Sequence, residues 1–404
     1  MFGHLRAFDG DPIFSLGEAF HADPRDLKVN LTVGLYYDEQ GRLPLLDVVR
    51  QAEQQWADQA LPRAYLPIEG LADYRAQVQK LVFGEHSAAL AENRVATIQT
   101  LGGTGALKVG GDFLHAAYPD SEMWISDPAW DNHHAIFNGA GISTHTYRYY
   151  DSATRGLDFE GMVEALAQLP KHSIVLLHPC CHNPTGVDLN DEQWLTVIEL
   201  LRDRELIPFV DMAYQGFGRS LDEDAYAIRA MDQAGLTFLV ANSFSKNFSY
   251  YSERCGGLSV VCQSAEEASR VLGQLKAVAR RIYSNPPSHG GQAIALILAD
   301  PDLYQTWRQQ VDQMRERIVS LRQKVYDRLQ ELVPNYDSSY FIKQQGMFCY
   351  TGLNPKQLQA LRSKHGVYII DSGRISLPGL NEDNLDYFVQ SLAAVITDPA
   401  LQET

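Results

Sequence analysis

Short apolar runs alternate with amphipathic segments through the middle of the chain. Runs such as Ser173–His178 (SIVLLH) and Thr237–Ala241 (TFLVA) are typical of strands buried on both faces of a parallel sheet. Between the runs, apolar residues recur at helical spacing. The expected strands are residues 95–100, 122–126, 173–178, 207–210 and 237–241, and the expected helices are residues 107–118, 191–204, 223–234 and 265–281. This alternation predicts an α/β domain with a mostly parallel sheet.

The two ends of the chain have a different pattern. Residues 1–30 mix acidic, aromatic and proline residues, and we expect an arm with a short helix there. Val29–Tyr37 (VNLTVGLYY) has the composition of a strand. Leu303–Leu332 is long, charged and helical in its spacing, and it leads into two short apolar runs at residues 347–352 and 367–370. We therefore expect a second, smaller domain near the C-terminus.

One lysine stands directly after an expected strand, in the stretch NSFSKNFSYYSER (Asn242–Arg254). A lysine at the end of a core strand is partly desolvated, which lowers the pKa of its amine and makes the neutral, nucleophilic form accessible. Such an amine suits a covalent bond to an aldehyde cofactor, and Ser243, Ser245 and Arg254 suit a phosphate. Lys246 is therefore a candidate to bind pyridoxal 5′-phosphate (PLP). The alternative is a lysine that extends into solvent from a strand end.

A glycine-rich turn follows the first expected strand of the sheet, at Leu101–Ala106 (LGGTGA). Bare backbone N–H groups and the positive end of a helix dipole meet at such a turn, which favours a phosphate. It does not match the dinucleotide fingerprint, because Lys108 occupies the position of the third glycine. It does not match a Walker loop either. The alternative is an ordinary turn between strand and helix.

Several polar candidates all follow expected strands, and the ligand of such a sheet binds at the carboxyl ends of its strands. PLP would use each of them. Asp211 can keep the pyridine nitrogen protonated, and Lys246 can move a proton from the substrate α-carbon, which converts an amino acid into a keto acid. The other expected roles are the phenolate oxygen for Asn183 and Tyr214, the ring face for Trp130, and the phosphate for Gly103, Thr104, Ser243, Ser245 and Arg254.

Composition limits the classes of partner. The 404 residues carry a formal net charge of −16, which disfavours nucleic acid and anionic membrane surfaces as ligands. Five cysteines, without a CxxC pair, indicate neither a disulfide framework nor a metal site, and we expect a cytoplasmic protein without a metal. Neither a signal peptide nor a membrane-spanning apolar run is expected.

The motifs resemble those of a known family along nearly the whole chain. HNPTG (His182–Gly186), DMAYQGF (Asp211–Phe217), SFSKNFSYYSERCGG (Ser243–Gly257), RRIYSNPP (Arg280–Pro287) and SGRISLPGL (Ser372–Leu380) are similar to the class I aminotransferases that act on aspartate and aromatic amino acids. LGGTGALKVG (Leu101–Gly110) and EDAYAIRA (Glu223–Ala230) look especially like the bacterial aromatic branch of that family.

The resemblance implies fold type I of the PLP-dependent transferases, with a seven-stranded, mostly parallel sheet covered by helices in a large domain and a smaller α+β domain. The implied boundaries are 1–45 for the N-terminal arm and part of the small domain, 46–312 for the large domain, and 313–404 for the rest of the small domain. It further implies a homodimer with shared active sites.

The resemblance also assigns substrate contacts. Arg374 would bind the substrate α-carboxylate, and Gly34, Trp130 and Asn183 would line the substrate site. Tyr65 would reach the phosphate from the neighbouring subunit. Arg280, also from the neighbour, would bind a side-chain carboxylate; it is preferred to Arg281 because it stands three residues before Tyr283.

The expected activity is transamination of tyrosine, phenylalanine and tryptophan, and of aspartate, with 2-oxoglutarate. The alternative is an aspartate aminotransferase with minor aromatic activity. A β-lyase or decarboxylase on the same fold is less favoured, because two arginines suit dicarboxylate substrates. A PLP-binding transcription regulator would need an added DNA-binding domain, and the missing fingerprint disfavours an oxidoreductase.

Overall fold

The chain forms two compact units, Met1–Leu43 with Ile318–Thr404, and Pro44–Arg317. The computed structural model describes residues 1–5 and 12–402, so residues 6–11 of the expected arm lie outside the described residues. The long expected helix is present as α12 (Pro301–Leu332), which contains the boundary between the units. Each unit has a core of its own.

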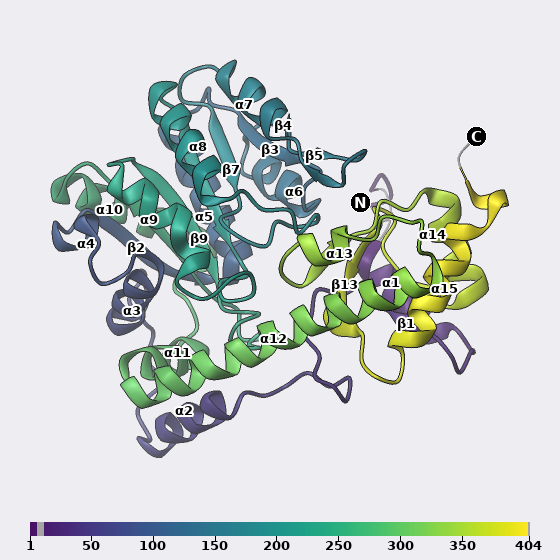
Figure 1. Cartoon of the computed structure of the whole chain (residues 1–404). Coiled ribbons are helices and arrows are strands. Elements are labelled where there is room, and N and C mark those ends of the chain that lie inside the picture. Colours follow the sequence, from purple (N-terminus) through teal and green to yellow (C-terminus); the bar gives the residue numbers. More distant parts are fainter. Residues whose placement is uncertain (6–11, 403–404) are drawn as a thin grey trace. The chain divides into compact units, whose positions relative to one another are not determined.

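The larger unit contains a seven-stranded sheet (Figure 1). In spatial order its strands are β2 (Val95–Leu101), β10 (Cys255–Val261), β9 (Phe238–Ser243), β8 (Ile207–Met212), β7 (Ile174–Leu177), β3 (Met123–Asp127) and β4 (Thr144–Arg148). All neighbours pair in parallel except β10, which is antiparallel to both β2 and β9. The expected mostly parallel, seven-stranded sheet is therefore confirmed.

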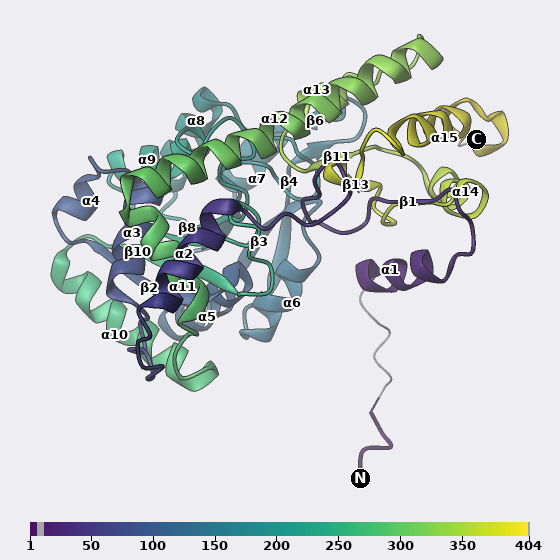
Figure 2. The same ribbon diagram turned by 90° about the horizontal axis from the view of Figure 1, so that it is seen from below.

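Helices surround this sheet. They are α2 (Asp47–Asp58), α3 (Ala72–Phe83), α4 (Ala88–Ala91), α5 (Gly102–Ala117), α6 (Asn132–Gly139), α7 (Phe159–Ala167), α8 (Asp191–Asp203), α9 (Tyr226–Gln233), α10 (Ala265–Ile282) and α11 (His289–Ala299), with the 3-10 turn η1 (Glu223–Ala225) and the hairpin β5 (Tyr150–Asp151)–β6 (Gly156–Leu157). Apolar side chains of α5, α6 and α10 form one core with the strands. In Figure 2, α2 and α11 lie side by side.

Local sequence explains where these helices begin. In α8, the Asn190 side chain accepts a hydrogen bond from the backbone N–H of Gln193, and the Gln193 side chain accepts one from the backbone N–H of Asn190. This capping box satisfies donors that a helix start leaves without partners. The helix then buries Trp194 and Val197 on one face, as its periodicity predicts.

The smaller unit is built from both ends of the chain. Its elements are α1 (Pro12–Ala22), β1 (Val29–Asn30), α13 (Tyr340–Lys343), β11 (Phe348–Tyr350), α14 (Pro355–His365), β12 (Val367–Tyr368), β13 (Arg374–Ser376), α15 (Leu385–Thr397) and the 3-10 turns η2 (Leu377–Gly379) and η3 (Pro399–Leu401). Parallel pairing of β1 with β12 joins the N-terminal segment to the C-terminal one. Among the described residues, no helix is both long and apolar enough to cross a membrane.

One expected strand is shorter than predicted, and two strands of the sheet were not predicted. The strand expected over Val29–Tyr37 ends at Asn30, whose side chain accepts hydrogen bonds from the backbone N–H and the hydroxyl of Thr32 and so turns the chain away. Strands β4 and β10 were not expected. The first is a short, polar edge strand, and the second begins with Cys255-Gly256-Gly257, which sequence propensity disfavours in a strand.

Candidate functional site

Three neighbouring strands of the larger unit bring most of the candidate residues together. Asp211 lies at the end of β8, opposite Ala241 of β9. Lys246 follows β9, and its Nζ lies 4.7 Å from the centre of the Tyr214 ring. Asn183 follows β7, the other neighbour of β8, and is buried. Because these strands are parallel, their carboxyl ends place the side chains at one edge of the sheet.

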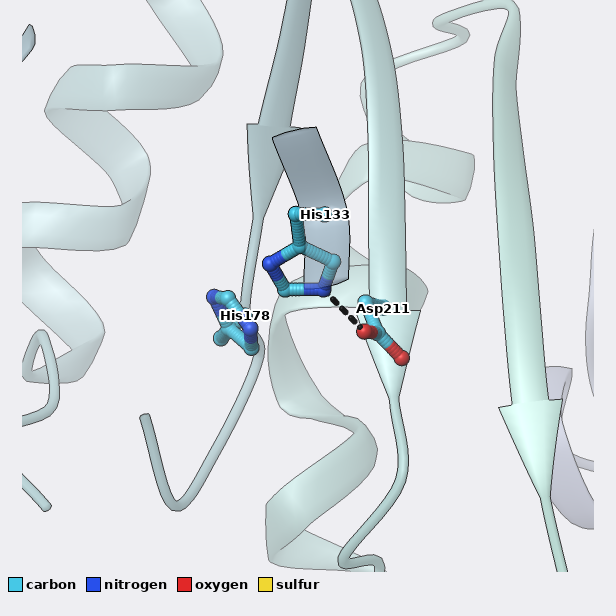
Figure 3. A group of neighbouring side chains, drawn as sticks. All are labelled: His133, His178 and Asp211. Atoms are coloured by element: carbon cyan, nitrogen blue, oxygen red, sulfur yellow. Dashed lines mark hydrogen bonds and ion pairs between the residues drawn. The ribbon is translucent and has the colours of Figure 1, made fainter. Parts of the chain in front are cut away.

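Asp211 is held by a histidine that the sequence reasoning did not single out. His133 on α6 is fully buried, and its Nε2 lies 2.8 Å from Asp211 Oδ2 (Figure 3). Burial alone would raise the pKa of Asp211, but the hydrogen bond from His133 and the nearby charge of Lys246 outweigh it and lower that pKa below its usual value. The carboxylate is therefore ionised at neutral pH although it is buried.

Two further buried histidines extend this group. The rings of His133 and His178 are 5.3 Å apart, and those of His178 and His182 are 4.7 Å apart. Burial, followed by the charge of His133, lowers the pKa of His178 to about 4. Burial also lowers the pKa of His182 well below its usual value. These two rings are neutral at physiological pH, so they do not neutralise the charge of Asp211.

The same group has the composition of a metal site. One ligand atom from each of His133, His178 and Asp211 lies within 4.8 Å of the others. The hydrogen bond between His133 and Asp211 explains this proximity without an ion. Because this hydrogen bond uses Oδ2 of Asp211, the other carboxylate oxygen, Oδ1, can accept a hydrogen bond from another donor.

A second cluster surrounds the N-terminus of α5. The register of β10 pairs Cys255 with Leu101 and Gly256 with Ser243, so the end of β9 lies close to the start of α5. A Cβ on Gly103 would lie 3.1 Å from the Ser243 Cβ, and a Cβ on Gly102 would lie 2.8 Å from a guanidinium nitrogen of Arg254. Only glycine leaves this space open, and the φ of +67° at Gly102 also favours glycine.

Hydroxyl and guanidinium groups complete this cluster. The hydroxyls of Ser243 and Ser245 are 3.2 Å apart, and Arg254 Nη1 lies 3.4 Å from the Ser245 hydroxyl. Thr104 is exposed in the first turn of α5. A cation, hydroxyls and a helix N-terminus together form an anion-binding site.

The chemistry of these two clusters fits PLP. The cofactor has a phosphate at one end and a basic ring nitrogen at the other. The Arg254 cluster can hold the first, and the ionised Asp211 can hold the protonated form of the second. Trp130 stands edge-on to His133, with ring centres 5.1 Å apart, and is therefore beside the partner of Asp211.

The substrate candidates Gly34 and Arg374 lie in the smaller unit. Arg374 is 3% exposed, donates to the Thr32 carbonyl at 2.7 Å, and stacks on the Phe348 ring with 4.1 Å between Cζ and the ring centre. A Cβ on Gly34 would lie 2.8 Å from the same ring. Phe348 thus positions both candidates, and the sequence reasoning did not identify it.

Tyr65 and Arg280 stand apart from these clusters by their exposure. Tyr65 is 92% exposed, which is unusual for a large aromatic side chain. Arg280 is exposed at the end of α10 and donates to the Ser284 hydroxyl. Their assignment to a neighbouring subunit stays a prediction.

Comparison with known proteins identifies the family. Residues 26–392 match the model of "Aminotransferase class I and II". The aromatic-amino-acid aminotransferase of Escherichia coli (strain K12) is 53% identical over 98% of this chain and 100% of its own.

Two solved structures are similar along the whole chain. One is an aromatic-amino-acid aminotransferase from Burkholderia pseudomallei covalently bound to pyridoxal phosphate, at 49% identity and a TM-score of 0.97 over 98% of this chain and 100% of that one. The other, with the same values, is a psychrophilic aromatic amino acids aminotransferase from Psychrobacter sp. B6, cocrystallised with aspartic acid.

Proposed function

Because the chain belongs to the family of class I and II aminotransferases, we propose that it transfers the amino group of aromatic L-amino acids, and of aspartate, to 2-oxoglutarate with PLP as its cofactor. The products are the corresponding keto acid and L-glutamate. The observation that carries this proposal is the buried, ionised Asp211 beside Lys246, together with the relatives' aromatic substrates. The alternative is an aspartate aminotransferase with minor aromatic activity.

PLP, when bound, supplies an electron sink for the electrons released at the substrate α-carbon. The protein's own groups do the rest. Lys246 Nζ would hold the cofactor through a covalent bond and, once released, would take the proton from the substrate α-carbon and hold it for return on the same face. The buried walls around Tyr214 and Asn183 exclude water from this proton.

Each remaining group orients the cofactor. Asp211 holds the proton on the ring nitrogen, because a buried carboxylate that stays ionised is a strong acceptor for it. Tyr214 and Asn183 would donate hydrogen bonds to the phenolate oxygen, and Trp130 would cover the ring. Gly103, Thr104, Ser243, Ser245 and Arg254 hold the phosphate. In this proposal the unit Pro44–Arg317 is the cofactor-binding domain, and Met1–Leu43 with Ile318–Thr404 is the small domain.

The substrate contacts rest on the family resemblance and on burial. Arg374 binds the α-carboxylate; it is preorganised by Phe348 and Thr32, so that little side-chain entropy is lost on binding. Arg280 binds the side-chain carboxylate of aspartate or 2-oxoglutarate. An aromatic side chain takes the same place when Arg280, on its long stem, turns toward solvent.

We also propose a homodimer in which Tyr65 and Arg280 complete the site of the neighbouring subunit. The exposure of both side chains in the single chain supports this assignment. A cytoplasmic location is supported by the five cysteines, which are all buried and form no disulfide among the described residues.

The test is a half-reaction without 2-oxoglutarate. Tyrosine, phenylalanine, tryptophan or aspartate is added separately to the PLP-loaded protein, and the absorbance of lysine-bound PLP is followed. We expect all four to remove it, the aromatic acids efficiently. Loss with aspartate alone would favour the alternative, and no loss with any of them would refute transamination. Borohydride reduction followed by peptide mapping should place the label on Lys246; a label on another lysine would refute its assignment.

A further inference from the structure

The larger unit contains a cavity of about 760 Å³ formed by α3, α4, α9 and the region from α11 to the start of α12. None of the residues that line it belongs to the candidate site around Lys246. Its volume lies in the range of small-molecule binding sites. Charges of both signs line it together with apolar side chains.

Two arginines of this cavity are held by one carboxylate. Asp222 Oδ1 lies 3.1 Å from Arg229 Nη2, and Asp222 Oδ2 lies 3.4 Å from Arg308 Nη2. The chain leaves room for this pair at Gly84, where φ is +83° and a Cβ would lie 3.3 Å from Arg229 Nε. Two guanidinium groups that share one carboxylate retain one net positive charge.

Lys80 adds a second positive charge to the same cavity. Its side chain is exposed at the end of α3, and it forms no ion pair with a described residue. Together with Arg308, it makes this part of the lining suited to a carboxylate.

A buried carboxylate provides the opposite charge. Asp232 is 5% exposed, and its Oδ2 accepts a hydrogen bond of 2.5 Å from the Ser87 hydroxyl. Its Oδ1 has no hydrogen-bond partner among the described residues. A buried oxygen without a donor is costly, so a cationic donor in the cavity would stabilise it. Glu85, exposed on the loop before α4, adds a second negative charge.

The remaining lining is apolar. Leu81 and Phe83 are nearly fully buried, and Leu298 and Tyr304 are half-buried. Leu298 and Tyr304 offer a surface on which an apolar or aromatic side chain can be removed from water, and Leu81 and Phe83 support them from below. The cavity therefore combines a cationic part, an anionic part and an apolar part.

We propose that this cavity is a second binding site, which takes a zwitterionic α-amino acid with an apolar side chain. The carboxylate binds Arg308 and Lys80, the ammonium group binds Asp232, and the side chain packs on Leu298 and Tyr304. A ligand with one charge alone would leave one of the two charged parts without a partner. Amino acids of the class that the enzyme transforms thus also occupy a non-catalytic site.

The experiment measures binding to protein that cannot turn over. The PLP-loaded protein is reduced with borohydride, which fixes the cofactor on its lysine, and the binding of labelled L-phenylalanine is measured by equilibrium dialysis. We expect saturable binding of one molecule per chain in this cavity. Lys80→Gln and Arg308→Gln should each weaken it about tenfold or more, because each removes a charge-assisted contact.

The matched control is Arg202→Gln, which removes an exposed arginine that is paired with Asp203 on α8 and does not line the cavity. It should leave binding unchanged. Phenylpyruvate and phenethylamine, which carry one charge each, should bind at least about tenfold more weakly than L-phenylalanine.

Three results would overturn the proposal: no saturable binding, binding that both Lys80→Gln and Arg308→Gln leave unchanged, or equal binding of phenylpyruvate. Because the reduced protein does not turn over, none of these results bears on the proposed transamination, which the half-reaction tests separately.

Discussion

Replacing His133 by phenylalanine tests how the site keeps Asp211 ionised. The substitution keeps a ring of similar size in the fully buried position but removes the Nε2 donor that lies 2.8 Å from Asp211 Oδ2. Burial raises the pKa of Asp211, and without this donor fewer groups stabilise the ionised carboxylate against it. The pKa of Asp211 should therefore rise. We expect the acidic limb of the activity profile to move to higher pH.

The size of the effect follows from the bond that is lost. A hydrogen bond to a charged group contributes about 1.5–3 kcal/mol. At about 1.4 kcal/mol per pH unit, the acidic limb should move up by roughly one to two pH units. At pH 8 Asp211 should still be ionised, so His133→Phe should retain far more activity than Asp211→Ala. The alanine variant should lose transamination by several orders of magnitude because the ring nitrogen loses its counterion.

The assay is the single-turnover half-reaction with L-phenylalanine, measured from about pH 5 to pH 9. The control is His134→Phe, which changes the next residue of α6, whose Nδ1 lies 2.9 Å from the Thr144 hydroxyl and not beside Asp211. The control should keep the original profile. Identical profiles for the two variants, or a His133→Phe protein as inactive at pH 8 as Asp211→Ala, would refute the role assigned to His133.

Three further predictions concern stability, assembly and specificity. A histidine in the unfolded chain takes up a proton near pH 6.5, but His178 in the folded protein does so only near pH 4. The stability that the neutral His178 ring contributes is therefore complete above pH 6.5 and is lost as the pH falls toward 4. His178 should thus lower the free energy of unfolding by about 1.4 kcal/mol for each pH unit in this window. Urea titrations at one protomer concentration should show that the stability of His178→Asn depends less steeply on pH than that of the unchanged protein. Equal pH dependence of the two proteins would contradict this. Mixing inactive Lys246→Ala and Arg280→Ala subunits should restore aspartate activity in hybrid dimers, and no recovery in confirmed hybrids would count against shared sites. Arg280→Leu should lower aspartate turnover by roughly ten- to a hundredfold, the value of a charged hydrogen bond, but should change the phenylalanine half-reaction little; an equal loss would mean that Arg280 is structural.

The cofactor residues could be proposed from the sequence because the sheet is parallel and buried. Each central strand is an apolar run, so its carboxyl end is visible where polar residues begin, as at Asp211 after Ile207–Val210. Parallel pairing then brings these ends together without any knowledge of side-chain contacts. The glycines at 102 and 103 were recognisable for the same reason, since they follow a strand and open a helix.

The supporting residues could not be proposed in this way. His133 lies on a helix, in the stretch Trp130-Asp131-Asn132-His133-His134, and nothing local distinguishes the buried histidine from its half-buried neighbour. Its role depends on how α6 packs against the sheet. Phe348 is likewise one apolar residue of a short strand until its ring is found beside both Gly34 and Arg374. Only packing reveals such residues.

The charges of the larger unit account for the orientation in which PLP is proposed to bind. Arg254 and the N-terminus of α5 make one part of the site positive, and Asp211 makes another part negative. Because His178 and His182 are held neutral by burial, these two side chains do not cancel the negative charge of Asp211. A ligand with a phosphate at one end and a protonated ring nitrogen at the other is stabilised in one orientation, and the reversed orientation would place like charges together at both ends. The electrostatic arrangement would thus favour the orientation in which the phosphate lies at Arg254 and the ring nitrogen lies at Asp211.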